Sequence, residues 1–109
     1  AQWNYPYNFV ENIQIAKYRS DNEGFYDWHM DAHSPKDGMQ RKLSAVILLN
    51  DPNEFEGGQL LFKGFEDEKI LTKQGSIVVF PSFIEHKVTP VTSGIRYTGV
   101  CWAIGPTFK

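Results

Sequence analysis

The sequence predicts an all-β domain, built as a jelly-roll barrel of two facing sheets with little helix. Short apolar or alternating segments follow one another along the chain, separated by clusters of Gly, Pro, Asn and Asp. Aromatic residues make up 15% of the chain, which suits a β core. No segment has the period of an amphipathic helix, and the one candidate, residues 1–10, contains Pro6.

The expected strands alternate with turns from residue 13 onward. Strands are expected at residues 13–19, 25–31, 42–50, 59–63, 67–72, 76–80, 86–91 and 95–104. Turns are expected at residues 20–24, 50–52, 55–58, 73–75 and 92–94. Residues 43–49 are apolar almost throughout, so this strand is expected to be buried on both faces. Residues 34–40 contain Pro, Lys, Asp and Gly and are expected to form an exposed loop.

Length and net charge indicate the number of domains and the kinds of partner to expect. The 109 residues are expected to form a single minimal domain, residues 1–109, with one core. The formal net charge of −2 gives no electrostatic reason to expect nucleic acid or a membrane surface as a partner. No apolar run approaches the roughly 18 residues of a membrane span, and no signal peptide is visible. A cytoplasmic location is therefore expected, and the oligomeric state is left open.

His29 and Asp31 form the most informative motif. They are two residues apart in a strand, so both side chains point to the same face, with Cα atoms about 6.6 Å apart. A further imidazole from His86 would complete two histidines and one carboxylate, the facial triad of a non-haem Fe(II) site. The motif by itself is weak, because His29 could equally be a half-buried strand histidine that is hydrogen-bonded to Asp31.

The faces of His86 and Arg96 test whether they can share a site. If Ser93 and Gly94 formed a two-residue hairpin turn, His86 and Arg96 would point to opposite sides of one sheet. Both can enter one site only if the turn is bulged or longer, or if the chain passes from one sheet to the other between them; the crossing is the arrangement expected here.

The order of these elements resembles the iron- and 2-oxoglutarate-dependent oxygenases, in particular their prolyl 4-hydroxylase-like branch, which has the double-stranded β-helix fold. The resemblance spans about residues 13–105. Its motifs are Tyr18, residues 25–31 with His-x-Asp, residues 41–44, 48–50, 56–58 and 75–80, His86, and Arg96 with Thr98. Larger members carry a helical N-terminal support, and no counterpart of it is expected within these 109 residues. One departure is Leu48, where the animal oxygen-sensing prolyl hydroxylases have a tyrosine that helps to hold the co-substrate.

The resemblance implies a role for each site residue. His29, Asp31 and His86 would bind Fe(II), and Arg96 would hold the far carboxylate of 2-oxoglutarate as a bidentate cation. A surface ion pair is the alternative for Arg96, but this residue shares one face of an apolar strand with Thr98, Val100 and Trp102.

Further contacts to the co-substrate are implied for five residues. Thr98 and Tyr18 would add hydroxyl groups, although Tyr18 could instead be packed inside the sheet. Trp102 is expected either to line the co-substrate pocket or to pack in the core. Leu60 and Val88 are expected to form part of the apolar wall of that pocket.

Hydroxylation is the expected activity. By the resemblance, O2 and Fe(II) convert 2-oxoglutarate to succinate and CO2 while the substrate is hydroxylated, with ascorbate as a possible support. The carboxylate of Asp31 stands where halogenating members have a small residue. His33 and Glu85 are not expected to take part.

A peptidyl proline is the expected substrate, with Tyr26, Trp28 and residues 34–40 as candidates to line its groove. The alternatives are the same chemistry on a free amino acid or other small molecule, a non-catalytic cupin-like jelly roll that binds metal or carboxylate, and a structural β-sandwich.

Overall fold

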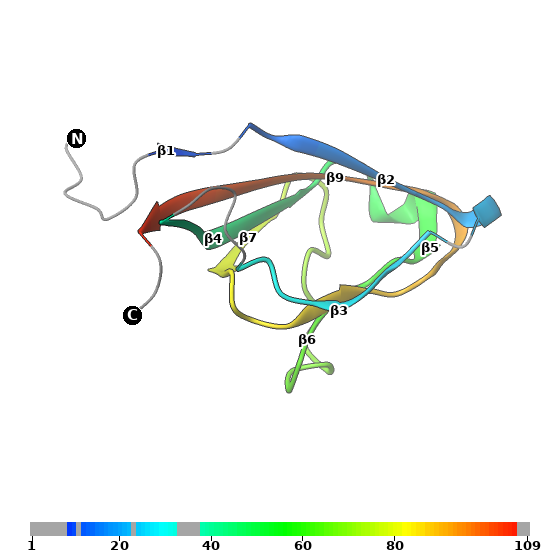
Figure 1. The fold of residues 1–109 in the computed structure, drawn as a ribbon. Coiled ribbons are helices and arrows are strands. Elements are labelled where there is room, and N and C mark those ends of the chain that lie inside the picture. Colours follow the sequence, from blue (N-terminus) through cyan, green and yellow to red (C-terminus); the bar gives the residue numbers. More distant parts are fainter. Residues whose placement is uncertain (1–8, 11, 23, 33–37, 107–109) are drawn as a thin grey trace.

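The computed structural model describes residues 9–10, 12–22, 24–32 and 38–106. Most of the regular structure in these residues is strand, arranged in two antiparallel sheets (Figure 1). The helical segments in the described ranges are two single turns of 3-10 helix, Ser20–Asn22 and Pro52–Glu54, and neither has the length or apolar character to cross a membrane. The expected all-β, jelly-roll class with little helix is confirmed.

The larger sheet is organised by one long strand that runs across the top of the molecule in Figure 1. This strand is β9 (Val91–Pro106). Its neighbours are β1 (Phe9–Val10), β2 (Gln14–Arg19), β4 (Met39–Leu48) and β5 (Phe55–Gly57), and β7 (Ile77–Pro81) pairs with β4. The smaller sheet has the order β3 (Tyr26–His29), β8 (His86–Val88), β6 (Leu60–Phe62). It lies below β9 in the view (Figure 1).

Residue alternation along β9 sets the inner face of the larger sheet. Arg96, Thr98 and Trp102 all point inward and are almost fully buried. Their partners on neighbouring strands share that face, because Tyr18 pairs with Arg96 and Leu48 pairs with Thr98. The inner face therefore carries a polar row on β9 within an otherwise apolar surface.

The chain crosses from the smaller to the larger sheet after β8, the strand that begins at His86. β8 belongs to the smaller sheet and β9 to the larger sheet, so the predicted crossing is confirmed. Its position differs from the prediction, because the break lies at Thr89 and Pro90, and residues 92–94 continue β9 instead of turning. Pro90 has no backbone N–H to donate to a ladder, which explains why the strand stops before it.

Other expected elements also differ from the structure. Residues 67–72 form bends and turns instead of a strand; their two adjacent apolar residues, Ile70 and Leu71, cannot lie on one strand face. Phe55 and Glu56, expected in a turn, pair with Gly94 and Ser93 of β9. The expected loop at residues 34–40 falls largely outside the described residues, and its last two residues begin β4.

A buried and an exposed residue on the paired strands β4 and β7 allow a test of the core packing. Leu48 is 0% exposed, whereas Ile77 on the neighbouring strand is 60% exposed. We expect Leu48→Ala to lower the free energy of unfolding by about 2–5 kcal/mol and Ile77→Ala by less than about 1 kcal/mol, because a cavity forms only at the buried site. Urea denaturation followed by circular dichroism measures both. Equal losses for the two variants would contradict this description of the core.

Candidate metal and co-substrate site

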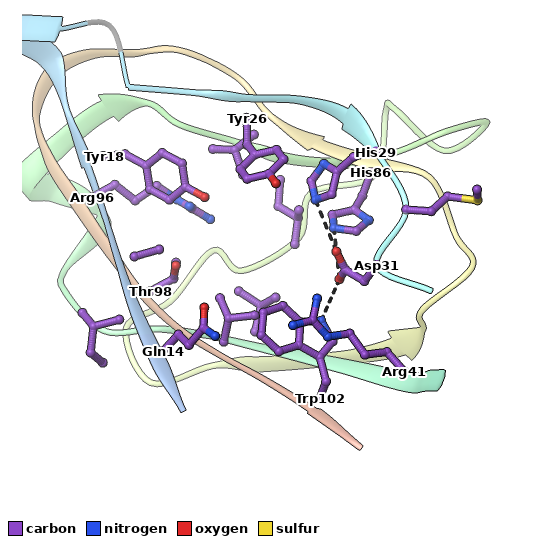
Figure 2. A pocket seen from close by; sticks show the side chains of 17 residues that line it. Gln14, Tyr18, Tyr26, His29, Asp31, Arg41, His86, Arg96, Thr98 and Trp102 are labelled. Atoms are coloured by element: carbon purple, nitrogen blue, oxygen red, sulfur yellow. Dashed lines mark hydrogen bonds and ion pairs between the residues drawn. The ribbon is translucent and has the colours of Figure 1, made fainter. Parts of the chain in front are cut away.

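Three potential metal ligands meet at the edge of the smaller sheet. His29 ends β3, His86 begins β8, and the two residues are direct cross-strand partners. Asp31 follows two residues after His29, and its carboxylate lies 3.4 Å from His29 Nε2 and 3.5 Å from His86 Nε2. One ligand atom from each residue lies within 4.8 Å of the others. The structure thus brings together the three residues that the sequence singled out (Figure 2).

Backbone carbonyls fix the orientation of both imidazole rings. His29 Nδ1 lies 2.7 Å from the Asp27 carbonyl oxygen, and His86 Nδ1 lies 2.9 Å from that of Ile84. A carbonyl only accepts, so each Nδ1 carries the proton and donates it. In the neutral ring each Nε2 is then the unprotonated nitrogen, which is the tautomer that a metal ion requires; a proton on His29 Nε2 would instead be donated to Asp31.

The carboxylate of Asp31 is held by hydrogen bonds from the larger sheet. Its Oδ2 accepts from the Ser44 hydroxyl at 2.7 Å and from Trp102 Nε1 at 3.1 Å. Ser82 supports this arrangement, since its hydroxyl lies 2.9 Å from that of Ser44 and its carbonyl accepts from the backbone N–H of Asp31. Oδ2 is therefore occupied by two donors, and Oδ1 faces His29.

The pKa shifts of Asp31 and His86 favour the protonation states that metal ligation needs, whereas that of His29 reflects its partner Asp31. Burial acts to raise the pKa of Asp31, but hydrogen bonds from His29, Ser44 and Trp102 prevail and hold it well below its usual range. Burial lowers the pKa of His86. For His29 burial also acts downward, but the hydrogen bond with Asp31 leaves its pKa raised. Near neutral pH the site therefore offers an ionised carboxylate, with a neutral imidazole at His86.

A buried arginine lies at the other end of the site. Arg96 is 2% exposed, and its Nη1 is the buried side-chain nitrogen for which no hydrogen-bond partner is found among the described residues. Its guanidinium lies 5.3 Å from the centre of the Tyr18 ring, and burial lowers its pKa. A buried cation without a paired carboxylate is energetically costly, and an anionic ligand would remove that cost.

A cavity of about 410 Å³ connects the two ends. Figure 2 shows Tyr18, Arg96 and Thr98 on one side, and His29, His86 and Asp31 on the other. The cavity wall includes every site residue expected from the sequence: Tyr18, His29, Asp31, Leu60, His86, Val88, Arg96, Thr98 and Trp102. Tyr26 also lines the cavity.

Some residues take positions that the sequence did not indicate. Trp102 lies beside Asp31, with the Arg41 guanidinium 3.7 Å from the centre of its ring (Figure 2). Trp28 does not line the cavity, and its ring is flanked by Lys63 and Lys87 at 5.0 and 4.8 Å. Glu85 is exposed, as expected, and His33 lies outside the described residues.

The support of Asp31 by Ser44 and Ser82 was missed by sequence reasoning. A signal for Ser44 existed, since a hydroxyl within a strand expected to be buried on both faces needs a hydrogen-bond partner. Ser82 and the carbonyls of Asp27 and Ile84 had no such signal, because their positions follow from tertiary packing.

Two histidines and one carboxylate inside a jelly roll, facing a buried cation, define a mononuclear non-haem metal site with room for an anionic ligand. The donor set fits Fe(II), since its nitrogen ligands have free Nε2 lone pairs and its carboxylate is ionised. A family model described as the 2OG-Fe(II) oxygenase superfamily matches residues 13–104. The chain belongs to this superfamily.

The chain is also similar to curated proteins that are named PKHD-type hydroxylases. A PKHD-type hydroxylase of Synechococcus sp. (strain CC9902) is 38% identical over 94 residues, which cover 85% of this chain and 41% of the relative. The PKHD-type hydroxylase YbiX of Escherichia coli is 34% identical over 89 residues, 77% of this chain and 40% of its own length. The chain thus spans about two-fifths of the length of these relatives.

Solved structures share the fold over nearly the whole chain. The 2OG complex of a viral collagen prolyl hydroxylase from Paramecium Bursaria Chlorella virus-1 gives a TM-score of 0.74 at 26% identity, covering 91% of this chain and 60% of the viral protein. A Pseudomonas putida prolyl-4-hydroxylase gives a TM-score of 0.70 at 27% identity, covering 94% of this chain and 55% of the bacterial protein.

The support of Asp31 yields a prediction. We expect Ser44→Ala to weaken divalent metal binding by about 10- to 100-fold, because one of two donors that orient the carboxylate is removed. Calorimetric titration with Mn(II) measures the effect. Ser76→Ala is the control, since that hydroxyl bonds to the Lys73 carbonyl at an exposed turn. Unchanged affinity in Ser44→Ala would show that this hydrogen bond does not orient the ligand.

Proposed function

We propose that this chain carries the active site of an Fe(II)- and 2-oxoglutarate-dependent hydroxylase that acts on a peptidyl proline. The observation that carries the proposal is the buried Arg96 at the opposite end of one cavity from His29, Asp31 and His86. A site with a chelating end and a cationic end matches a 2-oxo diacid, which has a chelating head and a second carboxylate.

The chain's own side chains would divide the work between the two ends. His29 and His86 would bind Fe(II) through Nε2, and Asp31 through the oxygen that Ser44 and Trp102 leave free. Bound Fe(II) supplies the oxidising chemistry, in which O2 and 2-oxoglutarate give succinate and CO2 and one oxygen atom becomes the hydroxyl of the product.

At the end of the cavity opposite the metal ligands, Arg96 would pair with the far carboxylate of 2-oxoglutarate, and the Thr98 and Tyr18 hydroxyls would add hydrogen bonds. Leu60 and Val88, 3% and 6% exposed, would exclude water from the stem of the co-substrate.

The names of the relatives support the substrate class. The curated relatives are called PKHD-type hydroxylases, and the solved structures at 26% and 27% identity are called prolyl hydroxylases. Tyr26, which is 53% exposed at the cavity wall, offers an aromatic surface for a proline ring. A cytoplasmic location, a single-domain organisation and the absence of nucleic-acid and membrane partners stay predictions of the sequence.

Three assays, carried out one after another, test the proposal. Anaerobic titration with Fe(II) and then 2-oxoglutarate should produce a weak visible charge-transfer band. Exposure to air with ascorbate should then release succinate. A panel of proline peptides and free amino acids follows, with mass spectrometry to detect the gain of one oxygen atom. Metal binding without 2-oxoglutarate binding or succinate release would instead indicate a cupin-like binding protein.

Removal of the buried cation gives a separate prediction. We expect Arg96→Gln to raise the KM for 2-oxoglutarate on the order of a hundredfold or more, since the far carboxylate loses its charged partner. Mn(II) affinity should stay within about twofold of the wild type, because Arg96 is not a metal ligand. Arg19→Gln is the matched control, since that exposed arginine pairs with Asp21. An unchanged KM in Arg96→Gln would contradict the assigned role.

A further inference from the structure

We propose that Gly58 is a positioning residue for Arg96: the space left by its missing side chain is the space through which the arginine stem runs to the cavity. The inference rests on the proposed function, in which the guanidinium of Arg96 receives the far carboxylate of 2-oxoglutarate. Nothing in the roles assigned above to the metal ligands or cavity wall requires a glycine at this position.

Close contacts around Gly58 are the first observation. A Cβ at this residue would lie 2.8 Å from Arg96 Cδ and 2.8 Å from Val91 Cγ2, closer than nonbonded carbon atoms can approach. Val91 is 0% exposed, so its side chain is packed on all sides and has no room to retreat. Arg96 is nearly as buried, but its stem is flexible and borders a second cavity, so it is the neighbour that can move, while the contact with Val91 stays and lowers stability.

The backbone of Gly58 is fixed by the sheet crossing. Its N–H donates to the Pro90 carbonyl at 3.1 Å. The next residue, Gln59, donates to the Thr89 hydroxyl at 2.8 Å, and its carbonyl accepts from the Thr89 N–H at 2.9 Å. These three hydrogen bonds join residues 58–59 to the segment that links β8 and β9. A new side chain at Gly58 could not be relieved by moving the backbone without breaking them.

The guanidinium has little to hold it if the stem is displaced. No hydrogen-bond partner for Nη1 is found in the described part of the chain, and the Tyr18 ring stands 5.3 Å away. A second cavity of about 290 Å³ borders both Gly58 and Arg96, on a wall shared with Leu60. The arginine can therefore tip into this space, so a substituted protein can fold while its cation is misplaced.

Gly64 supplies a matched control. Gly58 has φ +59° and Gly64 has φ +87°, so alanine is strained at either position by its backbone. No atom lies within 4 Å of a Cβ placed at Gly64, however, so that substitution adds strain without a collision. The difference between Gly58→Ala and Gly64→Ala isolates the contact with Arg96 and Val91.

Calorimetric titration of the Mn(II)-loaded protein with 2-oxoglutarate is the main test. We expect Gly58→Ala to raise the Kd for 2-oxoglutarate on the order of tenfold and Gly64→Ala to change it by less than about twofold. Mn(II) affinity should be the same in both variants, since the triad lies at the other end of the cavity. Equal 2-oxoglutarate affinities in Gly58→Ala and Gly64→Ala would overturn the inference.

Thermal unfolding in an Arg96→Ala background is the second test, and it does not depend on ligand binding. In both backgrounds Gly58→Ala should lower the Tm more than Gly64→Ala does, because the collision with Val91 remains, but this extra loss should be clearly smaller once the arginine stem is removed. If the extra loss of Tm in Gly58→Ala is the same in both backgrounds, the collision is with Val91 alone, and Gly58 does not position Arg96. If the wild type itself does not bind 2-oxoglutarate, the proposed function fails, while the thermal test still decides the contact between Gly58 and Arg96.

Discussion

The buried carboxylate of Asp31 is the interaction on which the architecture of the site depends. It stands between the two sheets, with His29 and His86 from the smaller sheet and Ser44 and Trp102 from the larger one. A carboxylate at 6% exposure is unstable unless polar groups surround it, so both sheets must present their donors at this point. The edge where β3, β4, β8 and β9 converge is therefore defined by an electrostatic requirement as well as by apolar packing.

The opposite end of the cavity has the complementary character. Arg96 brings a positive charge into the interior without a carboxylate partner among the described residues, and its neighbours there are mainly neutral. The carboxylate of Asp31 lies at one end and the guanidinium of Arg96 at the other, and the apolar side chains of Leu60 and Val88 also line the cavity. Apolar lining strengthens the field of both charges. Such a polarised cavity selects ligands by the separation of their charged groups as well as by their size.

The sequence was informative where spacing alone determines orientation. Residue parity along the last strand placed Arg96, Thr98 and Trp102 on one face, as the structure has them. His29 and Asp31 line the same cavity as expected, although β3 ends at His29 and Asp31 lies beyond the strand. Parity also excluded a two-residue hairpin between His86 and Arg96 and so favoured the crossing between sheets that the structure has. The site of crossing was misplaced because the turn signal of Gly94 was preferred to the missing donor of Pro90.

Sequence reasoning failed where tertiary contacts decide the outcome. The carbonyls that orient both imidazoles come from Asp27 and Ile84, and any residue could supply them. Residues 67–72 were expected to alternate as a strand, but the apolar Ile70 and Leu71 are adjacent, and the segment forms turns and bends. Gly57 and Gly58 read as an ordinary turn, and their close approach to Pro90 and Arg96 was visible only in three dimensions.

The continuity of β9 limits how this protein can change over evolutionary time. Arg96 and Trp102 reach opposite ends of one cavity from a single uninterrupted strand, separated by an even number of positions. One inserted or deleted residue between them would rotate one of the pair to the outside of the barrel. Sequence drift in this stretch is therefore confined to replacement of side chains, while length variation must accumulate in the turns beyond it.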